Sequence, residues 1–153
     1  MYEMATQHYF MNEALKEAKK AYEKGECPIG AVIVKDDMII SKGHNEKEIK
    51  KDPTKHAEIS AIKGACKSLD TWRLNGCDMY VTLEPCPMCA GAIIQSRIRS
   101  LFIGTFDPKS GAVGSVIDLL KVDQFNHKVE VTYGILREEC SNILKDFFKD
   151  LRK

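Results

Sequence analysis

The sequence has 153 residues and a formal net charge of +1, with 44% hydrophobic and 29% charged residues. These values are typical of a soluble globular protein, and the length suits one domain over residues 1–153. The near-neutral balance excludes a globally basic surface, so contact with RNA would need a local patch. The polar start lacks a secretory signal, and no apolar run approaches the roughly 20 residues of a transmembrane helix. We therefore expect a cytoplasmic protein without membrane contact.

Six cysteines are present, enough in principle for three disulfides. A reducing compartment instead favours free thiols and metal ligation. Two of the cysteines, Cys86 and Cys89, are only three residues apart. We expect the other four to be buried thiols with no metal role: Cys27, Cys66, Cys77 and Cys140.

The first third of the chain predicts a helix followed by a hairpin. Apolar residues at helical spacing indicate a helix over residues 7–24, which Gly25 would end. Two β-rich runs follow at 30–35 and 38–42, separated only by Asp36 and Asp37. This arrangement predicts an antiparallel hairpin.

The middle of the chain predicts two helices with a strand between them. A polar loop is expected over residues 43–53. Thr54 is the expected N-cap of a helix that ends near Ser68. A strand is then expected at 78–82 and a helix at 86–96.

The last third predicts two more strands and a closing helix. Residues 101–103 indicate a strand, and 107–114 a loop that contains proline and glycine. A short helical turn is expected over 115–120, and the alternation at 129–133 predicts the last strand. The closing helix has one apolar stripe, formed by Leu136, Cys140, Ile143, Leu144, Phe147 and Leu151.

The expected order of elements is α-β-β-α-β-α-β-β-α. The opening hairpin is antiparallel, whereas strands that alternate with helices pair in parallel. We therefore predict an α/β fold with a mixed five-stranded sheet and helices on both faces.

Two short fragments carry metal-binding residue types. His56-Ala57-Glu58 is followed, after 26 intervening residues, by Pro85-Cys86-Pro87-Met88-Cys89. Both fragments stand where a predicted helix begins after a loop. Cys86 and Cys89 would face one side of the first turn, where the helix N-terminus favours the thiolates that zinc needs. Pro87 is tolerated there because its missing N–H would be unpaired anyway.

With His56 as a third ligand, these residues predict a catalytic zinc site. Three protein ligands leave one tetrahedral position open, and water in that position ionises near pH 7. A deaminase needs such a hydroxide to attack an amino-bearing ring carbon. It also needs a group that protonates the ring nitrogen and then the departing ammonia, and Glu58 is placed for both transfers.

A Cys-x-x-Cys pair also occurs in structural zinc knuckles and in thiol-redox proteins. The knuckle would need a second pair, and Cys66 and Cys77 are poorly spaced for one. The redox interpretation leaves His56 and Glu58 unexplained. His-x-Glu together with Pro-Cys-x-x-Cys is the zinc-deaminase pattern, which favours an enzyme.

A closer resemblance extends over almost the whole chain. It rests on CPIGAV (27–32), DPTKHAE (52–58), YVTLEPCPMCAGA (80–92), DPKSGAVGS (107–115), NHKVEV (126–131) and DFF (146–148). In these segments the chain resembles the bacterial tRNA-specific adenosine deaminases of the cytidine/deoxycytidylate deaminase superfamily. The resemblance implies a three-layer α/β/α cytidine-deaminase-like fold and a homodimer. It also implies conversion of adenosine to inosine at the wobble position of the anticodon arm of tRNA.

The resemblance assigns zinc, one per subunit and with no organic cofactor, to His56, Cys86 and Cys89, and proton transfer to Glu58. It assigns substrate contacts to Asn45, the backbone N–H of Ala57, Asp107, Lys109, Ser110, Phe148 and Arg152, with Lys153 beside the last. Amides, aromatic rings and cations suit base edges, stacked bases and phosphates.

The same residue types have ordinary structural explanations, which remain open. Asn45 also suits a turn, the segment at 107–110 a surface loop, Phe148 the core, and Arg152 a solvated charge. His127 is placed to contact RNA or to serve the structure. Phosphate contacts are expected from Lys42, Lys55, Arg73 or Lys109.

A free-base deaminase acting on guanine or cytosine would share every residue of the zinc site. Only the loop at 107–115 and the closing helix favour RNA over such a base.

Overall fold

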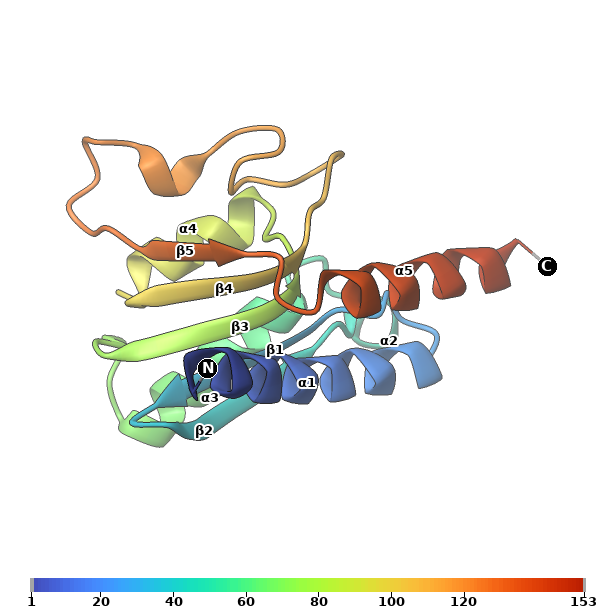
Figure 1. Ribbon diagram of the computed structural model, residues 1–153, viewed down its shortest axis with the longest axis horizontal. Helices are drawn as coiled ribbons and strands as arrows, with labels where there is room; N and C mark the ends of the chain where they lie inside the picture. The colour runs from blue at the N-terminus through green and yellow to red at the C-terminus, as the bar shows by residue number, and fades with distance from the viewer. Residues whose placement is uncertain (1, 153) are drawn as a thin grey trace.

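The computed structural model describes residues 2–152, with side chains from Met4 onward. Its centre is a five-stranded sheet in the order β2-β1-β3-β4-β5 (Figure 1). The strands are β1 (Gly30–Lys35), β2 (Met38–His44), β3 (Cys77–Leu83), β4 (Ser100–Thr105) and β5 (Glu130–Tyr133).

The sheet is mixed, as predicted. β1 pairs antiparallel with β2 and β3, whereas β3, β4 and β5 run parallel. Asp36 and Asp37, which connect β1 to β2, both have positive φ angles of 51° and 62°. Aspartate tolerates this region better than most residues, and a two-residue hairpin turn requires it. The expected hairpin is therefore confirmed.

Helices cover both faces of the sheet, which confirms the three-layer α/β/α fold. α1 (Tyr2–Glu23) and α5 (Arg137–Leu151) lie on one face, and α3 (Ala57–Leu69) and α4 (Pro87–Gln95) on the other (Figure 1). Alternate residues of β1 serve the two faces: Val32 and Val34 pack with α1, and Ala31 and Ile33 with α3. This follows from the two-residue period of a strand.

The expected N-cap at Thr54 is wrong. The N-cap of α3 is His56, and the helix begins at Ala57. The backbone N–H and the hydroxyl of Thr54 both donate to Asp52 Oδ1, at 2.9 and 2.7 Å. The local turn that these bonds form competes with capping.

Two other segments differ from the prediction. The polar loop at 43–53 contains a single helical turn, α2 (Lys47–Lys50), whose first N–H groups are bound by the distant Glu26. The helical turn expected over 115–120 is instead a 3₁₀ turn, η1 (Leu119–Lys121). The first difference comes from a contact with Glu26 that local sequence patterns do not reveal.

The remaining boundaries differ by a few residues. α1 begins five residues before the predicted start, and β2, β3 and β4 are each longer than predicted. Among residues 2–152, no helix is both long and apolar enough to cross a membrane. The fold thus places the loops that follow β3 and β4 at one edge of the sheet, where parallel strands end together.

Candidate metal centre and substrate cavity

His56, Cys86 and Cys89 come together at the N-terminal ends of two helices. His56 is the N-cap of α3, Cys86 is the N-cap of α4, and Cys89 lies in the first turn of α4. His56 Nδ1 lies 3.6 Å from the Sγ atom of each cysteine. One ligand atom from each residue lies within 4.8 Å of the other two.

A side-chain hydrogen bond from the residue that follows β2 holds the start of α3 in place. Asn45, directly after β2, accepts the backbone N–H of Ala57 on its Oδ1 at 2.9 Å. This bond satisfies one of the donors that a helix N-terminus leaves free. The N-cap His56 makes no side-chain capping bond, so its imidazole is available as a ligand.

Pro87 is the first residue of α4, in the turn that carries Cys86 and Cys89. The Cys86 carbonyl accepts the backbone N–H of Ala90 at 2.9 Å, so the helix begins directly after Cys86. Cys86 and Cys89 therefore sit on one side of the first turn, as their spacing predicted.

Hydrogen bonds among these three side chains shift their pKa values. Hydrogen bonding from Cys89 and then His56 lowers the pKa of the Cys86 thiol to about 4, against the opposing effect of burial. The pKa of Cys89 is raised, first by its hydrogen bond with Cys86 and then by burial. The bond with Cys86 also raises the pKa of His56. Of the two thiols, Cys86 is therefore the more acidic.

Glu58 is the second residue of α3, two residues after His56, and is only 3% exposed. Burial raises the pKa of its carboxyl group to about 7. A carboxyl group with a pKa near neutrality can both accept and return a proton. Glu58 faces the same cavity as His56 and Cys86.

The donor set fits a zinc ion. One imidazole nitrogen and two cysteine sulfurs are its preferred ligands, and three of them leave a tetrahedral position open. Within residues 2–152, this is the only group of three or more His, Cys, Asp or Glu residues close enough to share a metal.

A cavity of about 790 Å³ opens over this group. Its walls come from the α1–β1 connection, α2, the segment after β4 and the last two turns of α5. A volume of this size is typical of small-molecule and nucleotide sites. Five of the predicted substrate residues line it: Asn45, Asp107, Lys109, Ser110 and Phe148.

The β4 loop (residues 107–115) forms one wall of the cavity. The Asp107 carboxylate accepts the backbone N–H groups of Lys109 and Ser110, at 3.1 and 3.2 Å. One oxygen of Asp107 therefore shapes the loop itself, which agrees with the structural explanation for that residue. Lys109 and Ser110 are exposed at the cavity rim.

The adjacent residues Phe147 and Phe148 of α5 differ in burial, which separates core packing from contact with a ligand. Phe147 is 7% exposed and packs edge-on against Tyr22 of α1, with ring centroids 5.4 Å apart. Phe148 is 46% exposed and lines the cavity. Core packing therefore falls to Phe147, and Phe148 is left available for a ligand.

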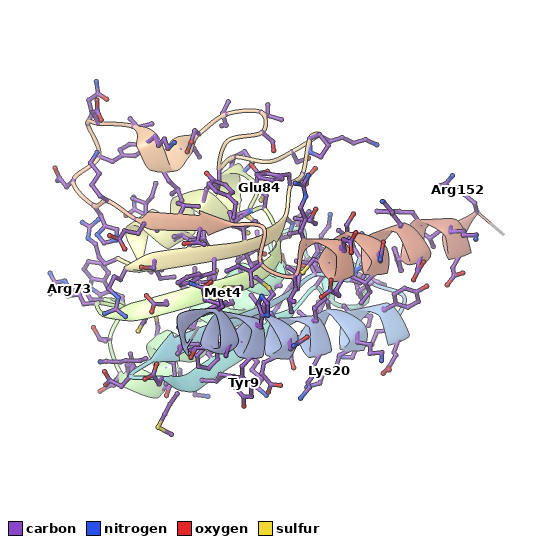
Figure 2. All side chains as sticks on the ribbon, in the orientation of Figure 1. Met4, Tyr9, Lys20, Arg73, Glu84 and Arg152 are labelled. Atoms are coloured by element: carbon purple, nitrogen blue, oxygen red, sulfur yellow. The ribbon has the colours of Figure 1, made fainter. Side chains whose placement is uncertain are left out.

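Two predicted contacts do not line the cavity. The N–H of Ala57 is bonded to Asn45, and Ala57 is fully buried. Arg152 lies at the far end of α5, where its Nε donates to the Phe148 carbonyl at 3.3 Å (Figure 2). The neighbouring Lys153 lies outside the described residues.

Of the four basic residues expected at phosphates, only Lys109 lines the cavity. Lys42 pairs with Glu13 at 3.6 Å, and Arg73 lies over the Trp72 ring at the opposite end of the molecule from Arg152 (Figure 2). His127 bonds the Ile98 carbonyl at 2.6 Å, which supports its structural explanation.

The four remaining cysteines differ in burial, although all four were predicted to be buried. Cys77 and Cys140 are buried, but Cys27 and Cys66 are only partly so. Cys27 lines the cavity, whereas Cys66 donates to the Trp72 carbonyl. Within residues 2–152, none of the four joins a group that could hold a metal.

Sequence reasoning missed two buried carboxylates, Glu26 and Glu84, that line the cavity and hold its walls. Each accepts backbone N–H groups from a distant segment. Their neighbours in the sequence give no sign of burial, because an acidic residue in a connection is usually solvated.

Comparison with known proteins identifies the family. A family model described as MafB19-like deaminase matches residues 4–152. The tRNA-specific adenosine deaminase of Bacillus subtilis (strain 168) is 52% identical over 150 residues, covering 98% of this chain and 93% of that protein. The enzyme of the same name from Aquifex aeolicus (strain VF5) is 53% identical over 144 residues, covering 94% and 95%. This chain belongs to the tRNA-specific adenosine deaminase family.

A solved structure agrees with the family assignment. It comes from studies of A-to-I editing by tRNA:A34 deaminases at the wobble position of transfer RNA. The two folds superpose with a TM-score of 0.86 at 46% identity, over 89% of this chain and 99% of the other. Membership of a deaminase family favours an enzyme over the redox and structural-zinc alternatives, because it accounts for His56 and Glu58 as well as the cysteines.

Proposed function

We propose that this protein hydrolyses adenosine to inosine at the wobble position of a tRNA anticodon, releasing ammonia. The observation that carries the proposal is the convergence of His56, Cys86 and Cys89 with the buried Glu58 at one cavity. The names of the relatives supply the substrate, and the shape and lining of the cavity are compatible with it.

His56, Cys86 and Cys89 would hold one zinc ion per subunit through Nδ1 and two Sγ atoms. When bound, zinc acts as a Lewis acid that makes water a nucleophile at neutral pH. The helix N-terminus beneath Cys86 and Cys89 favours their negative charge and so supports the site.

Glu58 would move the protons. It takes one from the attacking water and delivers it to the ring nitrogen next to C6 of adenine. It then takes the proton of the hydroxyl group now on C6 and passes it to the departing amino group, so that ammonia leaves, C6 becomes the carbonyl carbon of inosine and Glu58 returns to its starting state. Burial supports this cycle because it raises the pKa of the Glu58 carboxyl to about 7.

Asn45 would orient the base. Its Oδ1 accepts the N–H of Ala57, and its side-chain nitrogen Nδ2 makes no hydrogen bond with any residue from 4 to 152. That nitrogen can donate to an acceptor on the purine edge. The arrangement gives Asn45 both a structural role and a substrate role.

The outer part of the cavity would bind the RNA around the extruded base. An anticodon loop is already single-stranded, so extruding a base costs less than it would in a duplex. Phe148 offers an exposed ring for stacking, and Lys109 a cation for a phosphate. We propose further RNA contacts for Asp107, Ser110 and Arg152.

We further propose that the protein is a cytoplasmic homodimer. The segment before β5 packs against the core through Ala112, Val113 and Leu120. It leaves Val116 and Ile117 exposed by 56% and 46%. Neighbouring exposed apolar side chains favour a protein partner, which family resemblance identifies as a second copy. Sedimentation equilibrium of the purified chain tests this: a monomer at micromolar concentration would contradict it.

The alternative of a free-base deaminase shares the metal site and Glu58. It does not explain the exposed Phe148 and Lys109 at the rim. One experiment separates the two functions: the purified, zinc-loaded protein is incubated with an anticodon stem-loop that carries adenosine at the wobble position, and in parallel with guanine and cytosine.

The expected results are inosine in the RNA, about one zinc per chain, and no turnover of the free bases. Glu58→Ala should retain zinc and lose deamination. Activity on a free base alone would show that the substrate is that base and that the proposed RNA contacts are wrong. Deamination that persists in Glu58→Ala would contradict the assigned proton transfer.

A further inference from the structure

Glu84 is a fully enclosed carboxylate directly beyond β3. It is 2% exposed, it lies between Leu83 and Pro85, and Cys86 follows two residues later. Figure 2 shows its side chain where the ends of the sheet strands meet the loop that follows β4. Among residues 4–152, no lysine, arginine or histidine forms an ion pair with it.

Every hydrogen-bond partner of the Glu84 carboxylate belongs to the β4 loop. Oε1 accepts the backbone N–H of Asp107 at 3.0 Å and the hydroxyl of Ser115. Oε2 accepts the backbone N–H groups of Val113 and Ser115, at 2.9 and 3.0 Å. One carboxylate therefore binds both ends of the loop that forms the cavity wall.

Gly111 shows how closely the loop encloses this carboxylate. A Cβ atom on Gly111 would lie 2.3 Å from Cδ of Glu84 and within 2.5 Å of both oxygens. The next residue, Ala112, donates its N–H to the Pro85 carbonyl at 2.9 Å. The middle of the loop is thus held against residues 84–85, as its ends are.

Hydrogen bonds to both oxygens of this side chain require a carboxylate. An ionised carboxylate accepts hydrogen bonds on both oxygens, whereas an amide of the same shape accepts on only one. A buried charge is tolerated only when hydrogen bonds satisfy it, and here the loop supplies all of them. The β4 loop therefore stays ordered only while it binds Glu84, and Glu84 can stay buried only while the loop binds it.

We propose that Glu84 is a positioning residue that fixes the substrate-binding β4 loop relative to the metal centre. This proposal rests on the proposed function, because it takes Lys109 and Ser110 to contact substrate. Glu84 and the ligand Cys86 belong to one short stretch of chain, so the same segment sets the metal and the cavity wall. Glu84 itself does not touch the reacting atoms.

The variant that tests this is Glu84→Gln, which keeps the shape of the side chain and removes one acceptor. Amide hydrogen exchange, followed by mass spectrometry, should quicken at least about tenfold in residues 107–115, because backbone N–H groups lose their partner. Exchange in residues 47–50 should not change.

Glu26→Gln is the matched control. Glu26 is also a buried carboxylate beside the cavity, but it accepts the N–H groups of Glu48 and Ile49, at 3.1 and 2.7 Å. Its substitution should quicken exchange in residues 47–50 and leave residues 107–115 unchanged. If both variants loosen both segments, the effect is general destabilisation and the proposal fails.

Kinetics on the anticodon stem-loop supply the second measurement. Since the loop must be ordered again on binding, Glu84→Gln should raise KM about tenfold or more, while kcat falls less than about threefold. Zinc should stay near one per chain. A fall in kcat with KM unchanged, or loss of zinc, would overturn the positioning role.

Ser115→Ala keeps the test decisive if Glu84→Gln does not fold. It removes only the hydroxyl bond, so KM should rise about two- to fivefold. Gly111→Ala crowds the same carboxylate from the loop side, and combined with Ser115→Ala its effect on KM should be less than additive. Additive effects, or no change in KM, would contradict the proposal.

Failure of the proposed function is visible separately. If the wild-type protein leaves adenosine in the RNA unchanged, the proposed substrate is wrong. The exchange data then still decide whether Glu84 holds the β4 loop.

Discussion

Gly43 of β2 and Ala57 of α3 meet backbone to backbone. A Cβ atom on Gly43 would lie 2.4 Å from the Ala57 carbonyl oxygen and 2.8 Å from the backbone nitrogen of Ala61. No other residue type fits such a close approach without displacing the helix. The contact sets how deeply the start of α3, with His56 and Glu58, sits beside the sheet.

Substituting Gly43→Ala should therefore push the first turn of α3 away from β2. We expect a loss of about 1–3 kcal/mol in the free energy of unfolding, typical of overpacking, together with weaker zinc binding. Urea unfolding and metal titration with a chelator measure the two effects.

The control is Gly91→Ala in α4, where an added Cβ has no atom within 4 Å. It should leave zinc content unchanged and stabilise the helix by up to about 1 kcal/mol. If Gly43→Ala and Gly91→Ala bind zinc equally well, the β2–α3 contact does not control the metal site.

Truncation of Phe147 should lower stability, whereas truncation of Phe148 should lower RNA affinity. Phe147→Ala removes a buried ring and should cost about 3–5 kcal/mol of stability. Phe148→Ala should change stability by less than about 1 kcal/mol. It should nevertheless weaken binding of the anticodon stem-loop by about 1–3 kcal/mol, the value of one base stacked on an aromatic ring. Thermal unfolding and fluorescence anisotropy measure the pair, and unchanged RNA affinity in Phe148→Ala would remove it from the binding surface.

Cys27 should react slowly although it lines the cavity. Burial raises the pKa of its thiol from 9.0 to about 11. At pH 8 its thiolate fraction is then about 0.1%, compared with about 10% for the ordinary thiol, so alkylation should be about a hundredfold slower. The rate should rise about tenfold per pH unit until the pH nears 11. Iodoacetamide labelling with peptide mass spectrometry measures this, and the urea-unfolded chain is the reference for an ordinary rate.

Binding of RNA should weaken as salt increases, while zinc stays bound. Each phosphate neutralised on a single strand contributes about −0.7 to the slope of log affinity against log salt. Lys109→Ala should make the slope shallower by about that amount. Arg73→Ala is the control, because Arg73 lies over Trp72 at the far end of the molecule from Arg152 (Figure 2). An affinity that is insensitive to salt would show that no phosphate is bound.

The sequence by itself predicted the candidate metal site and most of the architecture. The spacing of Cys86 and Cys89, with His56 and Glu58 upstream, is a local pattern that already predicts two helix starts and a metal site. The order of elements and the mixed sheet also followed from sequence, because the periods of strands and helices are local properties. The alternation of helices with the later strands predicted parallel pairing there, and β3, β4 and β5 do pair in parallel.

Only the tertiary structure decided which residues form the walls of the cavity. Glu84 and Glu26 hold segments that are 20 or more residues away in the sequence, as the separations of 23 and 22 residues between hydrogen-bonded partners show. Phe147 and Phe148 are identical in type and adjacent, yet one is buried and the other exposed. That choice depends on how α5 lies against α1, which no pattern within α5 specifies.

Thr54 illustrates the same limit at a helix end. Its residue type predicts an N-cap, but Asp52 takes both of its donors and α3 begins at Ala57 instead. The cap is replaced by Asn45, twelve residues upstream of Ala57 and brought there by β2. Residue types fix which bonds are possible, and the packing of distant segments decides which of them form.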